Sequence, residues 1–208
     1  MRPVRRLSSL SESNRVEPDG EAHGDQPMVN GPILKGKVMT ANRDKLTTVQ
    51  DRYPRNVLMR NGHSAELRLM TRDDRDAILQ FAQTLPEDDL LFLRWDITQP
   101  QIVEEWIHEQ ETGRILTVLA FAEGELLGEG DLYHNETNWT RHLGEIRLLL
   151  SPAARGSGLG RILADEIYEM AGMLGLKMLT AQMTLDQHAA QAIFRRLGFQ
   201  REALLFDY

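Results

Sequence analysis

The spacing of apolar residues changes from segment to segment along the chain and predicts both strands and helices. Between residues 64 and 70, apolar side chains alternate with charged ones, as in a half-buried strand. Between residues 99 and 110 they recur every three or four positions, as on one buried face of a helix. The same two patterns predict strands at 57–60, 64–70, 114–122, 125–134, 143–150, 177–184 and 199–206. They also predict four helices: one that Thr71 caps and that ends before Pro86, and three at 99–110, 158–174 and 186–197.

Turn residues mark where several of these elements end. Asn61-Gly62 supplies the positive φ of a hairpin turn, and Gly175 and Gly198 stand just after two of the predicted helices. With the hairpin counted as one element, the order is β-α-α-β-β-β-α-β-α-β. This order predicts an α/β (α+β) fold, in which helices cover both faces of one mixed sheet.

The first 56 residues differ from the rest in composition. They hold five of the eight prolines and few large apolar residues, so they cannot bury enough surface to offset the entropy of ordering. We therefore expect residues 1–56 to be mostly disordered and residues 57–208 to form one domain. The N-terminal segment is either a partner-binding tail or a dispensable leader, with Met28, Met39 and Met59 as alternative starts.

Charge and composition disfavour several classes of function. Residues 57–208 hold fourteen Lys and Arg against twenty-four Asp and Glu, which argues against a nucleic-acid partner and favours a cationic acceptor such as an amine. The absence of cysteine excludes thiolate catalysis and fits a cytoplasmic location. No apolar run reaches the roughly 18–20 residues of a membrane helix, so we expect no membrane partner. The six histidines lack the spacing of a metal site, so we expect no metal.

The most informative segment is a glycine-rich loop between a predicted strand and a predicted helix. The strand ends at Leu150, and the loop reads Arg155-Gly156-Ser157-Gly158-Leu159-Gly160. Backbone N–H groups without partners, together with the helix dipole, make a helix N-terminus bind phosphate well. A dinucleotide G-x-G-x-x-G is excluded because residue 161 is Arg, and a P-loop is excluded because no Gly-Lys-Ser/Thr is present. The remaining pattern is Arg-x-x-Gly-x-Gly, with a purely structural turn as the alternative.

The stretch from Glu145 to Leu204 resembles the GNAT superfamily of acyl-CoA-dependent N-acyltransferases. The resemblance rests on the strand before the loop, the Arg-x-x-Gly-x-Gly loop, the long helix, and a second element that ends in Leu197-Gly198-Phe199. The hairpin and Glu145 are most similar to the domain of bacterial protein-lysine acetyltransferases. The resemblance implies acetyl-CoA as cosubstrate and a mostly antiparallel sheet that splays open at the acyl-CoA site.

The resemblance also implies roles for individual residues. The exposed backbone of Leu148 and Leu150 would pair with the pantetheine arm, and the amide near Leu149 or Leu150 would polarise the thioester carbonyl. Gln187 stands where the family often has an asparagine that contacts pantetheine. The loop that begins at Arg155 would hold the pyrophosphate through the amides of Gly156, Ser157, Gly158, Leu159, Gly160 and Arg161.

Two positions bear on catalysis. Acyl transfer needs a neutral amine, and Glu145 is the candidate general base; alternatively, it forms an ion pair with Arg147 or with a cation on the neighbouring strand. Many family members have a tyrosine at the cofactor-site position occupied here by Phe194, where it protonates the leaving thiolate. Phenylalanine cannot donate a proton, so the thiolate either leaves unaided or is protonated by another group.

The acceptor and the end of the chain leave alternatives open. Glu87-Asp88-Asp89, Phe92 and Trp95 fall in the region that shapes the acceptor site in this family, and we expect a protein lysine, a protein N-terminus or a small amine there. The competing hypothesis is a catalytically silent acyl-CoA-binding module. Because the sequence ends at Tyr208, we expect the family's last strand to be absent from it; on this expectation either the chain is truncated, or a partner chain, as in a homodimer, supplies that strand.

Overall fold

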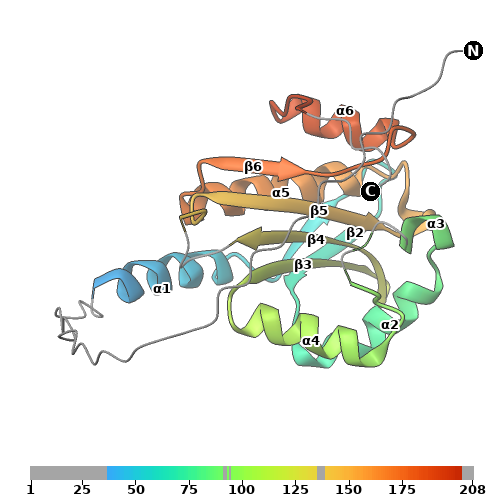
Figure 1. Ribbon diagram of the computed structural model, residues 1–208. Coiled ribbons are helices and arrows are strands. Elements are labelled where there is room, and N and C mark those ends of the chain that lie inside the picture. The colour runs from blue at the N-terminus through green and yellow to red at the C-terminus, as the bar shows by residue number, and fades with distance from the viewer. Residues whose placement is uncertain (1–36, 91–92, 94, 135–138, 203–208) are drawn as a thin grey trace, which may run out of the picture. The chain divides into compact units, whose positions relative to one another are not determined.

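The computed structural model describes residues 37–90, 93, 95–134 and 139–202 (Figure 1). The chain divides into the units 1–34 and 35–208, and all described residues belong to the second. The helices are α1 (Lys37–Gln50), α2 (Arg75–Gln83), α3 (Glu87–Leu90), α4 (Pro100–Glu111), α5 (Leu159–Leu174) and α6 (His188–Arg196), with short 3₁₀ turns at Arg72–Asp74 and Pro152–Ala154. The strands are β1 (Arg55–Leu58), β2 (Ser64–Leu69), β3 (Ile115–Ala122), β4 (Glu125–His134), β5 (Leu143–Leu150) and β6 (Met178–Ala181).

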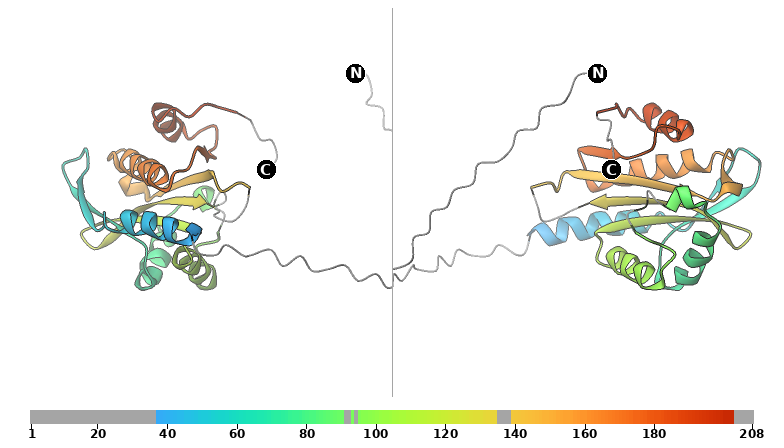
Figure 2. Two further views of the ribbon diagram at one scale, coloured as in Figure 1. Left: turned by 90° about the vertical axis from the view of Figure 1, so that its left-hand side faces the viewer. Right: turned by 45° about the vertical axis from the view of Figure 1, so that its right-hand side comes forward.

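The described strands form one six-stranded mixed sheet whose spatial order follows the chain. Every neighbouring pair is antiparallel except β5 and β6, which are parallel because α5 connects them as a crossover helix. Figure 2 shows α5 on one side of the sheet and α2 with α4 on the other. The predicted fold class is therefore confirmed.

Each face of the sheet carries its own apolar core. On the α5 side, Leu163 and Ile167 are fully buried against the sheet. An added Cβ at Gly130 would lie only 2.9 Å from Ile167 Cγ1, so the absence of a side chain there lets α5 approach β4 closely. On the other side, the predicted stripes of α2 and α4 are buried, as Ile78 and Trp106 illustrate.

The N-terminal boundary differs from the expectation. Ordered structure was expected from about Val57, yet α1 spans Lys37–Gln50 and β1 starts at Arg55. Val49 of α1 is 1% exposed in the core on the α5 side, and Lys45 Nζ donates to the carbonyl of Leu174 at 2.9 Å. This helix depends on packing against the domain rather than on its own composition, which is why composition alone missed it. The expectation of disorder for residues 1–36 lies outside the described residues.

The C-terminal part also differs in extent. β6 covers only Met178–Ala181 of the predicted strand 177–184. The described beginning of the predicted strand 199–206, up to Glu202, is not a strand, and residues 203–208 lie outside the described residues.

The hairpin turn predicted at Asn61-Gly62 is present between β1 and β2. Gly62 has φ +85°, and the Met59 N–H donates to the His63 carbonyl across the turn.

Candidate functional site

The parallel strands β5 and β6 separate halfway along β5. Leu143–Ile146 pair with Met178–Ala181, and the pairing stops there. The Ser151 N–H donates to the carbonyl of Leu127 on β4 at 2.9 Å. Because backbone groups alternate in direction along a strand, those of Leu148 and Leu150 point to the opposite, open side. An extended ligand can therefore pair with β5 where β6 has left it.

The open edge leads into the glycine loop at the start of α5. Gly156 and Gly158 have φ values of +77° and +90°, which glycine adopts without strain, and Gly158 is the N-cap of α5. Ser157 Oγ donates to the Ala154 carbonyl at 2.6 Å and accepts from the Leu159 N–H at 3.3 Å. Within the described chain, the N–H groups of Gly156, Gly158 and Gly160 have no backbone partner. This loop has the geometry of an anion site.

Contacts from distant parts of the chain hold the loop. The Arg60 N–H in the β1–β2 hairpin donates to the Ser157 carbonyl at 2.8 Å. The Arg155 guanidinium forms an ion pair with Asp89 of α3, so this side chain is directed toward the α2–α4 connection. The Arg161 side chain, in contrast, is largely exposed, and its Nε lies 3.6 Å from Oδ2 of Asp165, one turn further along α5.

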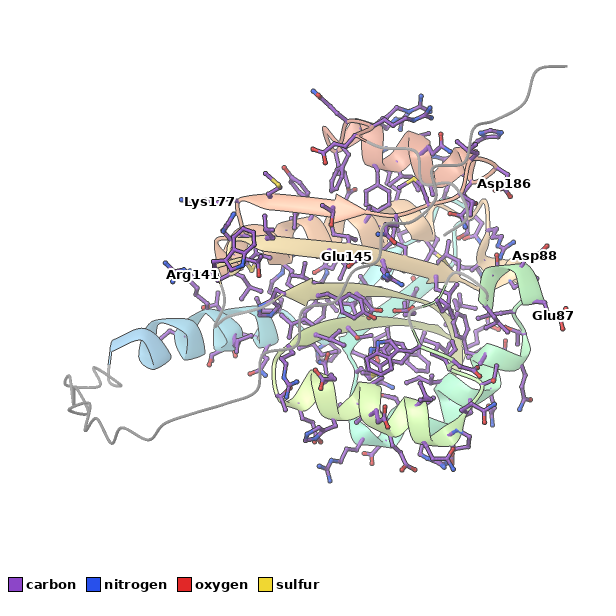
Figure 3. All side chains as sticks on the ribbon, in the orientation of Figure 1. Glu87, Asp88, Arg141, Glu145, Lys177 and Asp186 are labelled. Atoms are coloured by element: carbon purple, nitrogen blue, oxygen red, sulfur yellow. The ribbon has the colours of Figure 1, made fainter. Side chains whose placement is uncertain are left out.

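Glu145 lies on β5 and forms an ion pair with Arg147, which is one of the alternatives that the sequence left open (Figure 3). Arg147 Nε and Nη2 both lie 2.8 Å from the same oxygen, Glu145 Oε1. The guanidinium carbon of Arg147 is also 5.7 Å from the ring centre of Tyr133 on β4. The pairing therefore leaves Glu145 Oε2 available on the face of the sheet that carries α2 and α4.

The two family positions on α6 are both occupied differently from the usual pattern. Gln187 is the exposed N-cap residue of α6, and its Oε1 accepts from the Thr184 N–H at 3.3 Å. Phe194 is 5% exposed and packs edge-to-face on Phe199, with ring centroids 5.0 Å apart. Phe194 therefore belongs to the core, and its ring has no hydroxyl for proton transfer.

Two buried carboxyl groups on β4 were not predicted from the sequence. Glu129 is 4% and Asp131 3% exposed. Thr117 Oγ1 donates to Asp131 Oδ1 at 2.6 Å, and Tyr133 Oη donates to Asp131 Oδ2 at 3.3 Å. Burial raises the pKa of Asp131 to about 6. Burial, and then the negative charge of Asp131, raise the pKa of Glu129 well above its ordinary value.

Strand register places these carboxyl groups on the face of the sheet that carries the predicted base. Glu129, Asp131 and Tyr133 lie opposite Leu149, Arg147 and Glu145, respectively, on the same face of the sheet. The alternation of charged residues within the apolar stretch 125–134 is the only signal that the sequence offers, and it does not identify the neighbouring strand.

Acidic residues also surround the end of the sheet toward which β5 and β6 run. Glu87 and Asp88 project outward from α3, and Asp186 lies in the β6–α6 connection at the same end (Figure 3). Trp95 packs against the core under α2 and α4, whereas Phe92 lies outside the described residues. In the described part of the chain, no group of three His, Asp or Glu could hold a metal, and no helix is both long and apolar enough to cross a membrane.

Comparisons with known proteins agree with this fold. The chain is similar in structure to the GNAT domain of S. lividans PAT (17% identity, TM-score 0.66, covering 75% of this chain and 93% of that one). It is similar also to a GNAT-family acetyltransferase from Streptococcus pneumoniae (22% identity, TM-score 0.58, covering 67% of this chain and 86% of that one). A third similar structure is yncA from Salmonella typhimurium, solved with its cofactor acetyl-CoA (19% identity, TM-score 0.57, covering 67% of this chain and 81% of that one). None of the curated proteins compared with the chain matches it.

The family assignment rests on sequence as well as on fold. The profile of the Acetyltransferase (GNAT) family matches residues 78–199, more than half of the chain, from α2 through the glycine loop to the end of α6. The matched region thus contains the open edge of β5, the glycine loop and the face that carries Glu145. The chain belongs to the GNAT acetyltransferase family.

Proposed function

We propose that the protein transfers an acetyl group from acetyl-CoA to an amine by direct attack of the amine on the thioester. The observation that carries this proposal is the continuous path from the open backbone edge of Leu148 and Leu150 into the loop at the start of α5. An edge of unpaired peptide groups suits the amide-containing pantetheine arm, and the helix N-terminus suits a pyrophosphate. Both lie on one route, in the order in which CoA carries these groups.

In this proposal the backbone binds the cofactor. The amides of Gly156, Gly158 and Gly160 hold the pyrophosphate. Those of Ser157, Leu159 and Arg161, also expected there, instead donate to the Ala154 carbonyl, to Ser157 Oγ and to the Gly158 carbonyl, respectively. Gln187, at the start of α6, reaches the pantetheine arm. Since the amide direction alternates, the Leu149 N–H turns toward β4 and the Leu150 N–H toward the open edge. Leu149 is therefore excluded as a donor to the thioester oxygen, and the amides of Leu148 and Leu150 are the ones that face the ligand, where a developing negative charge can be stabilised.

Glu145 is the proposed general base. Its Oε2 takes the proton of the attacking amine, while Arg147 fixes the carboxylate through Oε1. The amine nitrogen bonds to the acetyl carbon, the carbon–sulfur bond breaks, and CoA leaves as a thiolate. The moderate basicity of a thiolate allows it to leave near neutral pH without a proton from position 194.

The acceptor is proposed to be cationic before it loses its proton. Glu87, Asp88 and Asp186 lie at the end of the sheet where the β5 edge is open, and residues 57–208 are strongly acidic. A protein lysine, a protein N-terminus and a small amine all satisfy this chemistry. A cytoplasmic location belongs to the same proposal and rests on the absence of cysteine from the chain.

The first test is binding of acetyl-CoA to the full chain by calorimetry. Gly156 has a positive φ, and an added Cβ there meets nothing within 4 Å. Gly156→Asp and Gly156→Asn therefore carry the same backbone strain and differ in charge alone. We expect Gly156→Asn to bind nearly as wild type and Gly156→Asp to lose most of its affinity, because the carboxylate repels the pyrophosphate. Equal affinity of the two variants, or no binding by a folded wild type, would contradict the cofactor site.

A second candidate function is a silent acyl-CoA-binding module, which the phenylalanine at position 194 favours. Glu145→Gln separates the two functions when binding and turnover are measured together. An enzyme loses rate in this variant, by roughly 10²-fold or more, and keeps its affinity for acetyl-CoA. A wild type that binds acetyl-CoA but releases no CoA thiol with a lysine peptide, spermidine or methylamine is the silent module.

A further inference from the structure

Two carboxyl groups next to the candidate base share a buried site. Glu129 and Asp131 are more than nine-tenths buried, and they stand two positions apart on β4, so their side chains share one face of the strand. Two ionised carboxylates at such a site repel each other and lose their hydration, so the pair retains one proton. Asp131 accepts bonds from Thr117 and Tyr133, whereas Glu129 Oε2 has no partner among the described residues. The proton therefore resides on Glu129, and Asp131 carries the charge.

Few charges act on this pair. Arg147, opposite Asp131 on β5, is the cation that faces it, and Arg147 is itself paired with Glu145. From β3 the pair is contacted by the Thr117 hydroxyl, which also accepts from Trp106 Nε1 of α4 at 3.2 Å. The buried residues that α2 and α4 contribute to this core carry no charge, and the ionisable groups of these helices lie at partly or fully exposed positions: Arg75, Asp76, Glu104, Glu105, His108, Glu109 and Glu111.

One side chain connects the pair to the candidate active site. Tyr133 is the register partner of Glu145, and residues directly opposite each other on antiparallel strands have Cβ atoms about 4.5–5.5 Å apart. The Tyr133 hydroxyl donates to Asp131 Oδ2 at 3.3 Å. Tyr133 itself is half-buried, whereas Glu145 is partly exposed and Asp131 is buried.

We propose that the Glu129–Asp131 pair is the final acceptor of the amine proton, reached from Glu145 through the Tyr133 hydroxyl. Glu145 Oε2 takes the proton from the amine and passes it to the Tyr133 oxygen, while Tyr133 passes its own proton to Asp131. Glu145 is thereby restored to a carboxylate, Tyr133 stays neutral, and the pair holds two protons until it releases one to solvent. Asp131, Glu129 and Tyr133 are positioning and relay residues, and their role rests on the proposed acetyl transfer.

The protonation of the pair is measured first, without any acceptor. Infrared spectra of the full chain at neutral pH should show the carbonyl band of a buried protonated carboxyl, and Glu129→Gln should lack that band. Thr117→Val and Tyr133→Phe each remove one hydrogen bond that favours ionised Asp131, so both should raise the pH at which the pair becomes fully protonated. A wild type without this band, or with the band unchanged in Glu129→Gln, would overturn the proposal.

The relay is measured by turnover with a lysine peptide, spermidine or methylamine as acceptor. Tyr133→Phe interrupts the path and should lower kcat by about 10-fold or more and shift its acid limb, with acetyl-CoA affinity unchanged. Thr117→Val alters the same buried pair but keeps the path through the Tyr133 hydroxyl. It should therefore shift the acid limb of the pH dependence of kcat with little loss of kcat itself.

Each outcome identifies what has failed. If Tyr133→Phe and Asp131→Asn turn over like wild type, with the same pH profile, the relay is overturned and acetyl transfer stands. If wild type binds acetyl-CoA and acetylates none of the three amines, the proposed function fails and the relay with it.

Discussion

Replacement of Glu166 by alanine should loosen the attachment of the N-terminal elements to α5. The Glu166 side chain is 1% exposed on α5 and accepts from Tyr53 Oη at 2.7 Å. Glu166 also pairs with Arg55, and its Oε1 lies 3.3 Å from Arg52 Nη2. These three partners lie in β1 or in the connection from α1, so one carboxylate joins the N-terminal elements to the helix that begins at the glycine loop.

The size of the loss depends on which partners can regain water. The Arg52 and Arg55 side chains are 22% and 40% exposed, and Arg52 keeps Glu169 at 2.7 Å, so neither arginine is left as a buried unpaired charge. The Tyr53 hydroxyl loses a bond to a charged acceptor, which contributes about 1.5–3 kcal/mol. The small cavity left on α5 adds to this loss. We expect the free energy of unfolding to fall by about 2–4 kcal/mol.

Urea unfolding of the full chain measures this loss, with Glu169→Ala as the matched control. Glu169 is on the same helix and binds the same Arg52, but its side chain is 58% exposed, so its loss should cost about 0–1 kcal/mol. Tyr53→Phe should show non-additive coupling with Glu166→Ala, since both remove one bond. The reasoning is refuted if Glu166→Ala destabilises no more than Glu169→Ala, or if the double variant is simply additive.

Substitutions at Gly130, Phe194 and Asp131 test other parts of the structure. Gly130→Ala places a Cβ 2.9 Å from Ile167 Cγ1 and should lower the free energy of unfolding in urea by about 1–3 kcal/mol. Gly172→Ala has open space around the new Cβ and should raise it by about 0.5–1 kcal/mol. The reverse order would contradict the close approach of α5 to β4. Phe194→Tyr should leave kcat for CoA release unchanged, because the thiolate leaves unaided and position 194 is buried in the core; a rise of about 10-fold or more would contradict unaided departure. The pKa of Asp131 is raised to about 6, against 3.8 when unfolded, so the folded state binds the proton of this carboxyl more tightly. The contribution of that proton to the free energy of unfolding is complete below pH 4 and is lost as pH rises through 6. Asp131→Asn should remove this decline of about 3 kcal/mol, which unfolding measured from pH 4 to 8 would detect.

Local patterns predicted most elements, because the features that define them lie within a few residues. The helix expected at 99–110 is observed at Pro100–Glu111, and the helix expected at 158–174 at Leu159–Leu174. The glycine loop was recognised for the same reason: its positive φ angles and its place at a helix start depend on neighbouring residues.

Features that depend on distant contacts could not be predicted in this way. α1 is stabilised by packing such as that of Val49 against the core, and its own composition does not indicate it. Asp131 became part of the candidate site only once the register set it opposite Arg147. The ion pair of Arg155 with Asp89 joins residues 66 positions apart, and nothing in either segment identifies the other.

The short pairing of β5 with β6 has a consequence for the stability of the free protein. Four residues of each strand are bonded, so the β6–α6 end of the domain should open locally at a lower free energy than the strands before it. A ligand that binds along the open edge would occupy the place of the absent neighbour and would protect the amides of Leu148 and Leu150 from hydrogen exchange. At 100 times its dissociation constant, such a ligand would stabilise the fold by about 2.7 kcal/mol. The acyl donor would then act as a temporary strand of the sheet, and the cell's supply of acetyl-CoA would set how firmly this end of the domain is closed.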